Sequence, residues 1–178
     1  MAARPSVDHL VVASADLAVG TEWVARRLGV TPAPGGVHPG LGTRNALLGL
    51  GDLYLEVLAL DPAQQGRSSR FADLARGRGE PALVTLAVAR DDLEDPVPMS
   101  RRRPDGTSMS WQVQFTGTPL FYIDWLDSPR PAGLPDGGSL TRLTVTTPAP
   151  QELAGVAGIE VREGPWHVEA DVDGTPLA

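Results

Sequence analysis

The sequence of 178 residues is 42% hydrophobic and 21% charged, which is typical of a single globular domain. It contains no cysteine and no lysine, which excludes disulfide bonds, thiolate nucleophiles and lysine Schiff bases. The formal net charge of -7, with no basic cluster larger than residues 101–103, argues against nucleic acid as a partner. No apolar run approaches the roughly 18 residues of a membrane span, and no hydrophobic signal-peptide core follows the N-terminus, which predicts a cytoplasmic protein without a membrane partner.

The first half of the chain, residues 7–60, is predicted to form a strand, a helix and three more strands. The helix can be capped at its start by Ser14 or Asp16, and Gly29 supplies a left-handed end. Gly51-Asp52 is a tight hairpin signal between two apolar runs. The predicted elements are a strand at residues 7–13, the helix, a short strand and open loop within 31–42, and strands at 45–50 and 53–60.

The pattern restarts after a polar linker at residues 61–81. A second module over residues 82–126 has only a turn in place of the helix, because residues 94–98 contain two prolines. Aligning Asp92-Leu93 with Asp16-Leu17 places Thr85 where His9 stands in the first module. The predicted strands of this module are residues 82–89, 99–102, 107–115 and 119–126.

The C-terminal extension, residues 139–174, is predicted as a strand, a short helix and two strands. The strands are residues 140–146, 159–162 and 166–172, and the last two are expected to form a hairpin. We therefore predict one α+β domain over residues 1–178. It consists of paired strand–helix–three-strand modules followed by the βαββ extension.

Five segments carry a resemblance to a known family. They are Asp8-His9-Leu10-Val11-Val12, residues 38–45 (HPGLGTRN), Tyr54-Leu55-Glu56-Val57, residues 100–106 (SRRRPDG) and Ile123-Asp124-Trp125. In order and spacing this set resembles the glyoxalase-like domains of the vicinal oxygen chelate superfamily, which includes glyoxalases, bleomycin resistance proteins and dioxygenases. The resemblance spans residues 7–148, and it implies that the paired modules form a curled, mostly antiparallel sheet, or cup.

The resemblance implies a fold more than a reaction, because the superfamily includes isomerases, dioxygenases, epimerases and metal-free drug-binding proteins. Metal-using members place ligands on the first and fourth strand of each module, and members often pair modules across a dimer. A homodimer is therefore possible for this chain.

Strand alternation suggests which residues face the inside of the cup, since residues two apart share a face. On four strands one polar side chain stands among apolar ones, and we expect these four to converge: His9, Glu56, Thr85 and Asp124. The set His9, Glu56 and Asp124 could hold a divalent iron, manganese, zinc or nickel ion. Thr85 weakens that interpretation, because metal-using relatives have a stronger ligand there. The alternative is a buried His–carboxylate pair that lines a metal-free pocket.

Further polar residues are candidates for the rim of the same pocket. Glu56 or His38 could move a proton as a catalytic acid or base, or His38 could be an imidazole of a surface loop. Thr43 and Asn45 could bind a ligand or form hydrogen bonds within their own loop. Trp111 could form a wall of the pocket or simply belong to the core. Arg101 and Arg103 could clamp a carboxylate, or form a solvated edge.

Two functions of different classes follow. The first is a metal-dependent lyase, isomerase or dioxygenase that acts on a small oxygenated metabolite. The second is a metal-free protein that binds or sequesters a small molecule, as drug-resistance members of the superfamily do. Nothing in the sequence identifies the ligand.

Overall fold

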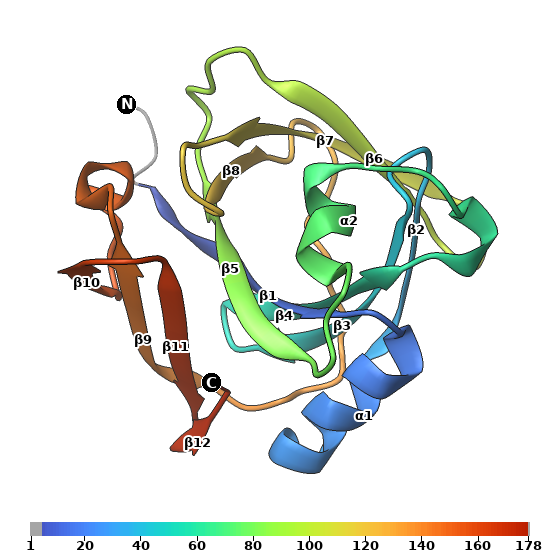
Figure 1. Cartoon of the computed structure of the whole chain (residues 1–178), viewed down its shortest axis with the longest axis horizontal. Coiled ribbons are helices and arrows are strands. Elements are labelled where there is room, and N and C mark those ends of the chain that lie inside the picture. The colour runs from blue at the N-terminus through green and yellow to red at the C-terminus, as the bar shows by residue number, and fades with distance from the viewer. Residues whose placement is uncertain (1–4, 178) are drawn as a thin grey trace.

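The computed structural model describes residues 5–177, which form a closed barrel of eight strands and a separate sheet of four (Figure 1). The barrel order is β1-β4-β3-β2-β6-β7-β8-β5. The barrel strands are β1 Ser6–Ser14, β2 Ala33–His38, β3 Thr43–Leu50, β4 Leu53–Leu60, β5 Ala82–Ala89, β6 Val97–Arg102, β7 Ser108–Phe115 and β8 Phe121–Asp124. The fold class predicted from the sequence is confirmed, with the cup closed into a barrel.

The helix α1, Leu17–Leu28, has the ends that its sequence predicts. The Asp16 side chain accepts a hydrogen bond from the Val19 backbone N–H, and Gly29 ends the helix at φ 73°. Trp23 and Val24 are buried against the outside of the barrel. Local chemistry therefore sets both the position and the length of this helix.

The two modules meet at both edges of the curled sheet. β1 pairs in parallel with β4 of its own module and antiparallel with β5 of the other module. On the opposite side, β2 and β6 close the barrel through the pair of Val37 and Arg102. A Cβ on Gly36 would lie 2.1 Å from the Arg102 carbonyl oxygen, so glycine is required where these strands meet.

Helix α2, Arg70–Ala75, forms where the sequence predicts a linker with only a weak turn. The Ser69 side chain caps it by accepting a hydrogen bond from the Ala72 N–H. The Arg70 guanidinium donates to the carbonyls of Thr116 and Thr118, which follow β7. These tertiary contacts stabilise a helix of six residues that would be marginal alone. Figure 1 shows α2 lying over one opening of the barrel.

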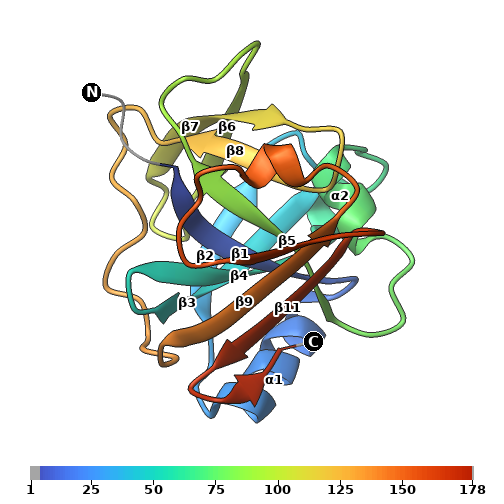
Figure 2. The same cartoon turned by 90° about the vertical axis from the view of Figure 1, so that its left-hand side faces the viewer.

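The C-terminal sheet has the order β10-β9-β11-β12 and lies outside the barrel (Figure 2). Its strands are β9 Leu140–Thr147, β10 Glu160–Glu163, β11 His167–Val172 and β12 Thr175–Pro176. The predicted hairpin is wrong, because β10 and β11 pair with opposite edges of β9. The predicted short helix is a 3-10 turn, η2 Pro150–Leu153, and a similar turn, η1 Pro62–Gln64, precedes α2.

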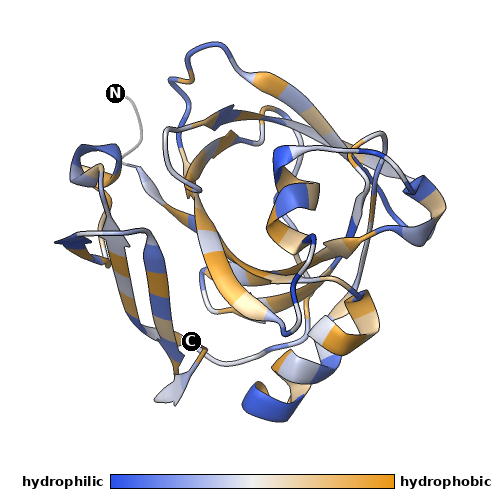
Figure 3. Cartoon of the chain, viewed as in Figure 1, coloured by the Kyte–Doolittle hydropathy of each residue, from blue (hydrophilic) through white to orange (hydrophobic). Residues whose placement is uncertain are grey.

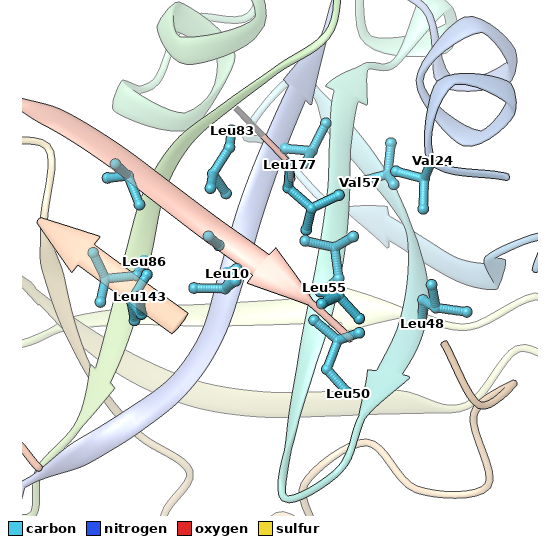
Figure 4. Packing of buried hydrophobic residues seen from close by; sticks show 14 of the residues in the cluster. Leu10, Val24, Leu48, Leu50, Leu55, Val57, Leu83, Leu86, Leu143 and Leu177 are labelled. Carbon is cyan, nitrogen blue, oxygen red and sulfur yellow. The ribbon is translucent and has the colours of Figure 1, made fainter. Parts of the chain in front are cut away.

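Side chains alternate in hydropathy along β9 and β11, as Figure 3 shows. Their apolar faces join the outer faces of β1, β4 and β5 in one buried cluster that includes Leu10, Leu86, Leu143 and Leu177 (Figure 4). A second cluster fills the barrel interior around Val11, and the site described below opens within it. In the described part of the chain, no helix is long and apolar enough to cross a membrane.

Candidate functional site

A cavity lies inside the barrel, beneath α2. Its walls come from both modules and from the loop after β2. The volume in which the centre of a water molecule fits is about 30 Å³, so the cavity can hold about two waters. The lining residues are His9, His38, Leu41, Asn45, Tyr54, Glu56, Leu58, Phe71, Met99, Arg101, Trp111, Phe121, Ile123 and Trp125.

Glu56 is the central polar group of this cavity. It lies on β4 and alternation directs it inward, as the sequence predicts. Asn45 donates from Nδ2 to Glu56 Oε1 over 2.6 Å. His9 Nε2 lies 3.4 Å from Glu56 Oε2, and His38 Nε2 lies 3.8 Å from Oε1. Two imidazoles and one carboxamide therefore converge on one buried carboxylate.

His9 is held between two carboxylates. Its Nδ1 lies 2.7 Å from Asp8 Oδ2 on the side opposite Glu56. Asp8 is fully buried, and its other oxygen accepts from Trp125 Nε1 at 3.1 Å and faces Arg130 Nε at 2.9 Å. Charges thus alternate from Arg130 on the half-exposed rim, through Asp8 and His9, to Glu56.

The pKa values of His9 and Glu56 follow from this pairing. Burial disfavours the charged form of His9, but hydrogen bonding to Asp8 and the nearby Glu56 carboxylate outweigh burial and raise its pKa to about 9. Burial likewise raises the pKa of Glu56, but His9, His38 and Asn45 together lower it to about 2. At neutral pH His9 is therefore an imidazolium and Glu56 a carboxylate.

His38 has the opposite charge state. Burial is the main cause of its lowered pKa, and Arg101 and His9 add to that effect. Its ring is neutral at neutral pH. Asn45 Nδ2 lies 3.3 Å from Nε2, and Thr43 Oγ1 lies 2.9 Å from Nδ1. Because the amide can only donate, Nε2 accepts and Nδ1 carries the proton that is donated to Thr43.

Aromatic rings form much of the cavity wall. Tyr54 stacks on His9 with ring centroids 4.6 Å apart, and burial raises the pKa of its hydroxyl well above the ordinary value. Trp111 packs edge-on to His38 and lies 5.2 Å from the Trp125 ring. Such walls exclude water and strengthen the electrostatic interactions inside.

Six of the residues that the sequence singles out line this cavity, and a seventh contacts one of them. His9, His38, Asn45, Glu56 and Arg101 line it as polar groups, and Trp111 as an apolar wall. Thr43 contacts the cavity through His38. Their roles in binding or catalysis stay predictions.

Asp124 and Thr85 do not join this group, so the expected convergence of four polar residues is wrong. On β8 it is Phe121 and Ile123 that line the cavity, and the Asp124 side chain accepts from Gln112 on β7 instead. Thr85 donates its hydroxyl to the Pro119 carbonyl over 2.9 Å. Arg103 lies on a separate outer groove.

The repeat explains what stands at the expected position. In module one, Glu56 on β4 pairs with Val11, which lies two positions after His9 on β1. In module two, Phe121 on β8 pairs with Ala87, which lies two positions after Thr85 on β5. An aromatic side chain therefore occupies the place that corresponds to Glu56, and the second module contributes no carboxylate to the cavity.

Sequence reasoning missed the roles of Asp8 and Arg130. Alternation sends the neighbour of His9 to the opposite face, but the pairing of β1 with β5 is irregular between Val7 and His9. This irregularity lets Asp8 reach the His9 ring. The adjacency of Asp8 and His9 in the sequence could have indicated their pairing. No local pattern indicates Arg130, which lies 122 positions after Asp8 in the chain.

The residues of the cavity do not fit the divalent metal that the fold family suggests. Within residues 5–177, no group of three or more His, Cys, Asp or Glu side chains is placed to hold an ion. His9 is an imidazolium whose two nitrogens face carboxylates, so it offers no free lone pair. Asp124 cannot complete the predicted set with His9 and Glu56, because it lies outside the cavity.

Comparison with known proteins gives the family. The model of the glyoxalase-like domain matches residues 7–157, and no curated protein matches. A hypothetical protein from Staphylococcus aureus has a TM-score of 0.61 at 14% identity, covering 94% of this chain and 88% of that one.

Methylmalonyl-CoA epimerase from Mycobacterium tuberculosis is also similar, with a TM-score of 0.44 and 20% identity, over 66% of this chain and 85% of the epimerase. A variant of the Streptomyces coelicolor methylmalonyl-CoA epimerase, in complex with 2-nitronate-propionyl-CoA, has a TM-score of 0.47 and 17% identity, covering 72% of this chain and 100% of that one. The likeness to the Staphylococcus aureus protein, at 14% identity, shows the fold alone. With most of its length matched by the family model, the chain belongs to the glyoxalase-like domain family.

Proposed function

We propose that this protein binds a small oxygen-bearing organic molecule inside the barrel and moves a proton on it, as an isomerase or lyase. The observation that carries the proposal is the buried Glu56 carboxylate with the neutral His38 ring at 3.8 Å and the charged His9 ring at 3.4 Å. Groups with opposed protonation states in one water-poor cavity are typical of acid–base chemistry.

His38 is the group that exchanges the proton. It is neutral at neutral pH, and the 3.3 Å contact that Nε2 accepts from Asn45 must give way to the substrate, because Asn45 donates more closely to Glu56. Nε2 then takes a proton from a carbon next to a carbonyl, while the electron pair of the C–H bond moves to the carbonyl oxygen as an enolate. The imidazolium that forms faces the ionised Glu56. Thr43 holds the ring by accepting from Nδ1. Return of the proton to the other face or to another atom completes an isomerisation.

Glu56 stabilises charge and is not itself the base. A carboxylate with a pKa of about 2 stays ionised at every physiological pH, but it has little affinity for a proton. Its role resembles that of a carboxylate that orients and stabilises a catalytic imidazolium. Asn45 holds Glu56 in place through the 2.6 Å hydrogen bond.

A second function, binding without turnover, is favoured by the apolar part of the cavity. Phe71, Phe121, Trp111 and Trp125 make up a large share of the wall. A mostly apolar pocket with a few polar groups suffices to hold a small molecule. The two functions differ in whether a proton leaves the bound molecule.

The experiment is proton exchange in deuterated water, followed by NMR with hydroxyacetone, dihydroxyacetone, pyruvate and lactate as probes. We expect exchange at the carbon next to the carbonyl of at least one probe, lost in both His38→Asn and Glu56→Gln. Asp124→Asn is the matched control, because that carboxylate lies outside the cavity. Saturable binding without exchange would favour the second function, and exchange that survives His38→Asn would refute the proposed base.

A further inference from the structure

Arg101 is a buried cation, and the structure of residues 5–177 shows no counter-ion for it. The residue is 3% exposed, and among the same residues its Nε has no hydrogen-bond partner. In the part of the chain that the structure describes, its one hydrogen bond runs from Nη2 to the Met109 sulfur over 3.2 Å. A guanidinium carries five N–H donors, and a thioether is a weak acceptor. No carboxylate lies within ion-pair distance of it among the same residues.

The surroundings of Arg101 make this arrangement costly. Arg103 donates to the same Met109 sulfur over 3.1 Å, so two like charges share one weak acceptor. Glu56 lies in the same cavity, but His9 already neutralises it. Burial lowers the pKa of Arg101. An unpaired buried charge destabilises a fold strongly, so its presence needs an explanation, such as a catalytic role or a bound ion.

Arg101 also lies at a junction between two spaces. It lines the central cavity together with His38 and Glu56, and it lines an outer groove of about 370 Å³. The other side of that groove is the Pro/Gly-rich segment 131–134, which also lines a neighbouring pocket together with Gly51 and Asp52 of the β3–β4 turn. A ligand that reaches from the groove into the cavity would meet the guanidinium first.

We infer that Arg101 binds the carboxylate of a small organic acid, whose oxygen-bearing carbon then lies at His38 and Glu56. This assignment rests on the proposed function and names its substrate class. A planar carboxylate can accept two parallel N–H bonds from one guanidinium, which meets the unused donors of Arg101. A dianion fits less well, because the ionised Glu56 lies in the same cavity.

The test is binding of pyruvate and acetate, measured by quenching of tryptophan fluorescence. Trp111 and Trp125 line the cavity, so they report its occupancy. We expect saturable binding to the wild type, at least tenfold weaker binding to Arg101→Met, and a smaller loss in Arg101→Lys. Arg102→Met is the matched control, because Arg102 neighbours Arg101 on β6 and its side chain is exposed. It should bind as the wild type does.

Thermal unfolding of the empty proteins gives a second readout. Removing an unpaired buried charge should raise the melting temperature of Arg101→Met, whereas an arginine with a purely structural role would lower it. If Arg101→Met does not fold, Arg101→Gln and Arg101→Lys replace it in the binding test.

Three results would overturn the assignment. The first is that neither acid saturates the wild type up to about 50 mM, which corresponds to a very weak affinity. The second is that Arg101→Met binds the acids as tightly as the wild type does, and the third is that inorganic phosphate binds more tightly than both acids. The proposed function fails separately. His38→Asn should still bind pyruvate, because Arg101 is intact in that variant. If the wild type binds pyruvate but exchanges no proton, the proposed proton transfer is refuted while the role of Arg101 is supported.

Discussion

Four charged side chains, Arg130, Asp8, His9 and Glu56, alternate in sign from the rim of the barrel to its interior. Each inner group has a partner of opposite charge on one or both sides. Burial of such groups is tolerated only while the whole row is intact, because removal of one partner leaves another charge unpaired. The charge state of the cavity is therefore a property of the row rather than of Glu56 alone.

The pH dependence of stability should reveal this row. The pKa of His9 rises from 6.5 to about 9, so its contribution to the free energy of unfolding is complete below pH 6.5 and is lost as pH rises through about 9. The pKa of Glu56 falls from 4.5 to about 2, so its contribution is complete above pH 4.5 and is lost as pH falls through about 2. We expect this contribution to be greatest between pH 4.5 and 6.5, measured by urea unfolding.

Replacing Glu56 by Gln should lower the free energy of unfolding at pH 6 by about 1 to 3 kcal/mol, since His9 keeps Asp8 as its remaining counter-ion. The variant should also lose stability less steeply below pH 4.5 than the wild type. Glu22→Gln is the control, because Glu22 is exposed on α1 and should leave the profile unchanged. A Glu56→Gln profile that runs parallel to the wild type would contradict the pairing.

Metal content tests the donor chemistry of the same residues. We expect protein purified without chelator to contain well below one equivalent of iron, manganese, zinc or nickel, because His9 is protonated and module two supplies Phe121 and Thr85 rather than ligands. His9→Ala should leave that content unchanged. A full equivalent of one metal that His9→Ala removes would show that the row rearranges around an ion.

Helix α2 lies over one opening of the barrel and supplies part of the cavity wall. Phe71 on this helix lines the cavity and packs on Phe121 with ring centroids 5.1 Å apart. The cavity has room for about two waters, so an organic ligand needs additional space, either from the outer groove or from a shift of α2. With six residues and a single side-chain cap, α2 is held mainly by contacts that can break locally.

Truncation of Phe71 should open the site. We expect Phe71→Ala to increase acrylamide quenching of tryptophan fluorescence, because Trp111 and Trp125 become accessible from the α2 side, and to cost about 2 kcal/mol of stability. Phe115→Ala is the matched control: Phe115 packs on Phe71 but does not line the cavity. Equal quenching in the two variants would show that α2 is not the barrier.

At the scale of the whole molecule, the C-terminal sheet and the barrel share one apolar cluster. A direct polar contact joins them as well, since Trp166 Nε1 donates to the Val84 carbonyl over 2.8 Å. Neither sheet could bury its apolar face alone. That residues 1–178 form a single domain stays a prediction.

We therefore expect one cooperative unfolding transition. Urea unfolding followed by circular dichroism and by tryptophan fluorescence should give the same midpoint. Trp166→Phe should shift both signals together and cost about 1 kcal/mol, the usual value of one lost hydrogen bond. Two separated transitions, or a shift confined to one signal, would show that the extension is an independent unit.

Much of the fold follows from local chemistry that the sequence states directly. The caps at Asp16 and Gly29 bound α1, and the turn at Gly51 joins β3 to β4. Alternation on the long strands β1 and β4 directs His9 and Glu56 into the barrel because eight or nine residues of consistent pattern define a face. The fold class and half of the candidate site are therefore predictable from sequence.

Contacts between distant segments decided the rest. On β8, with only four residues, the face is set by pairing with β5 and β7, and that register turns Asp124 outward and Phe121 inward. The partners of β9, the docking of α2 and the missing counter-ion of Arg101 are likewise properties of the assembled barrel. A strand register that differs by one residue reverses every side chain, and only packing against the completed core selects between the two.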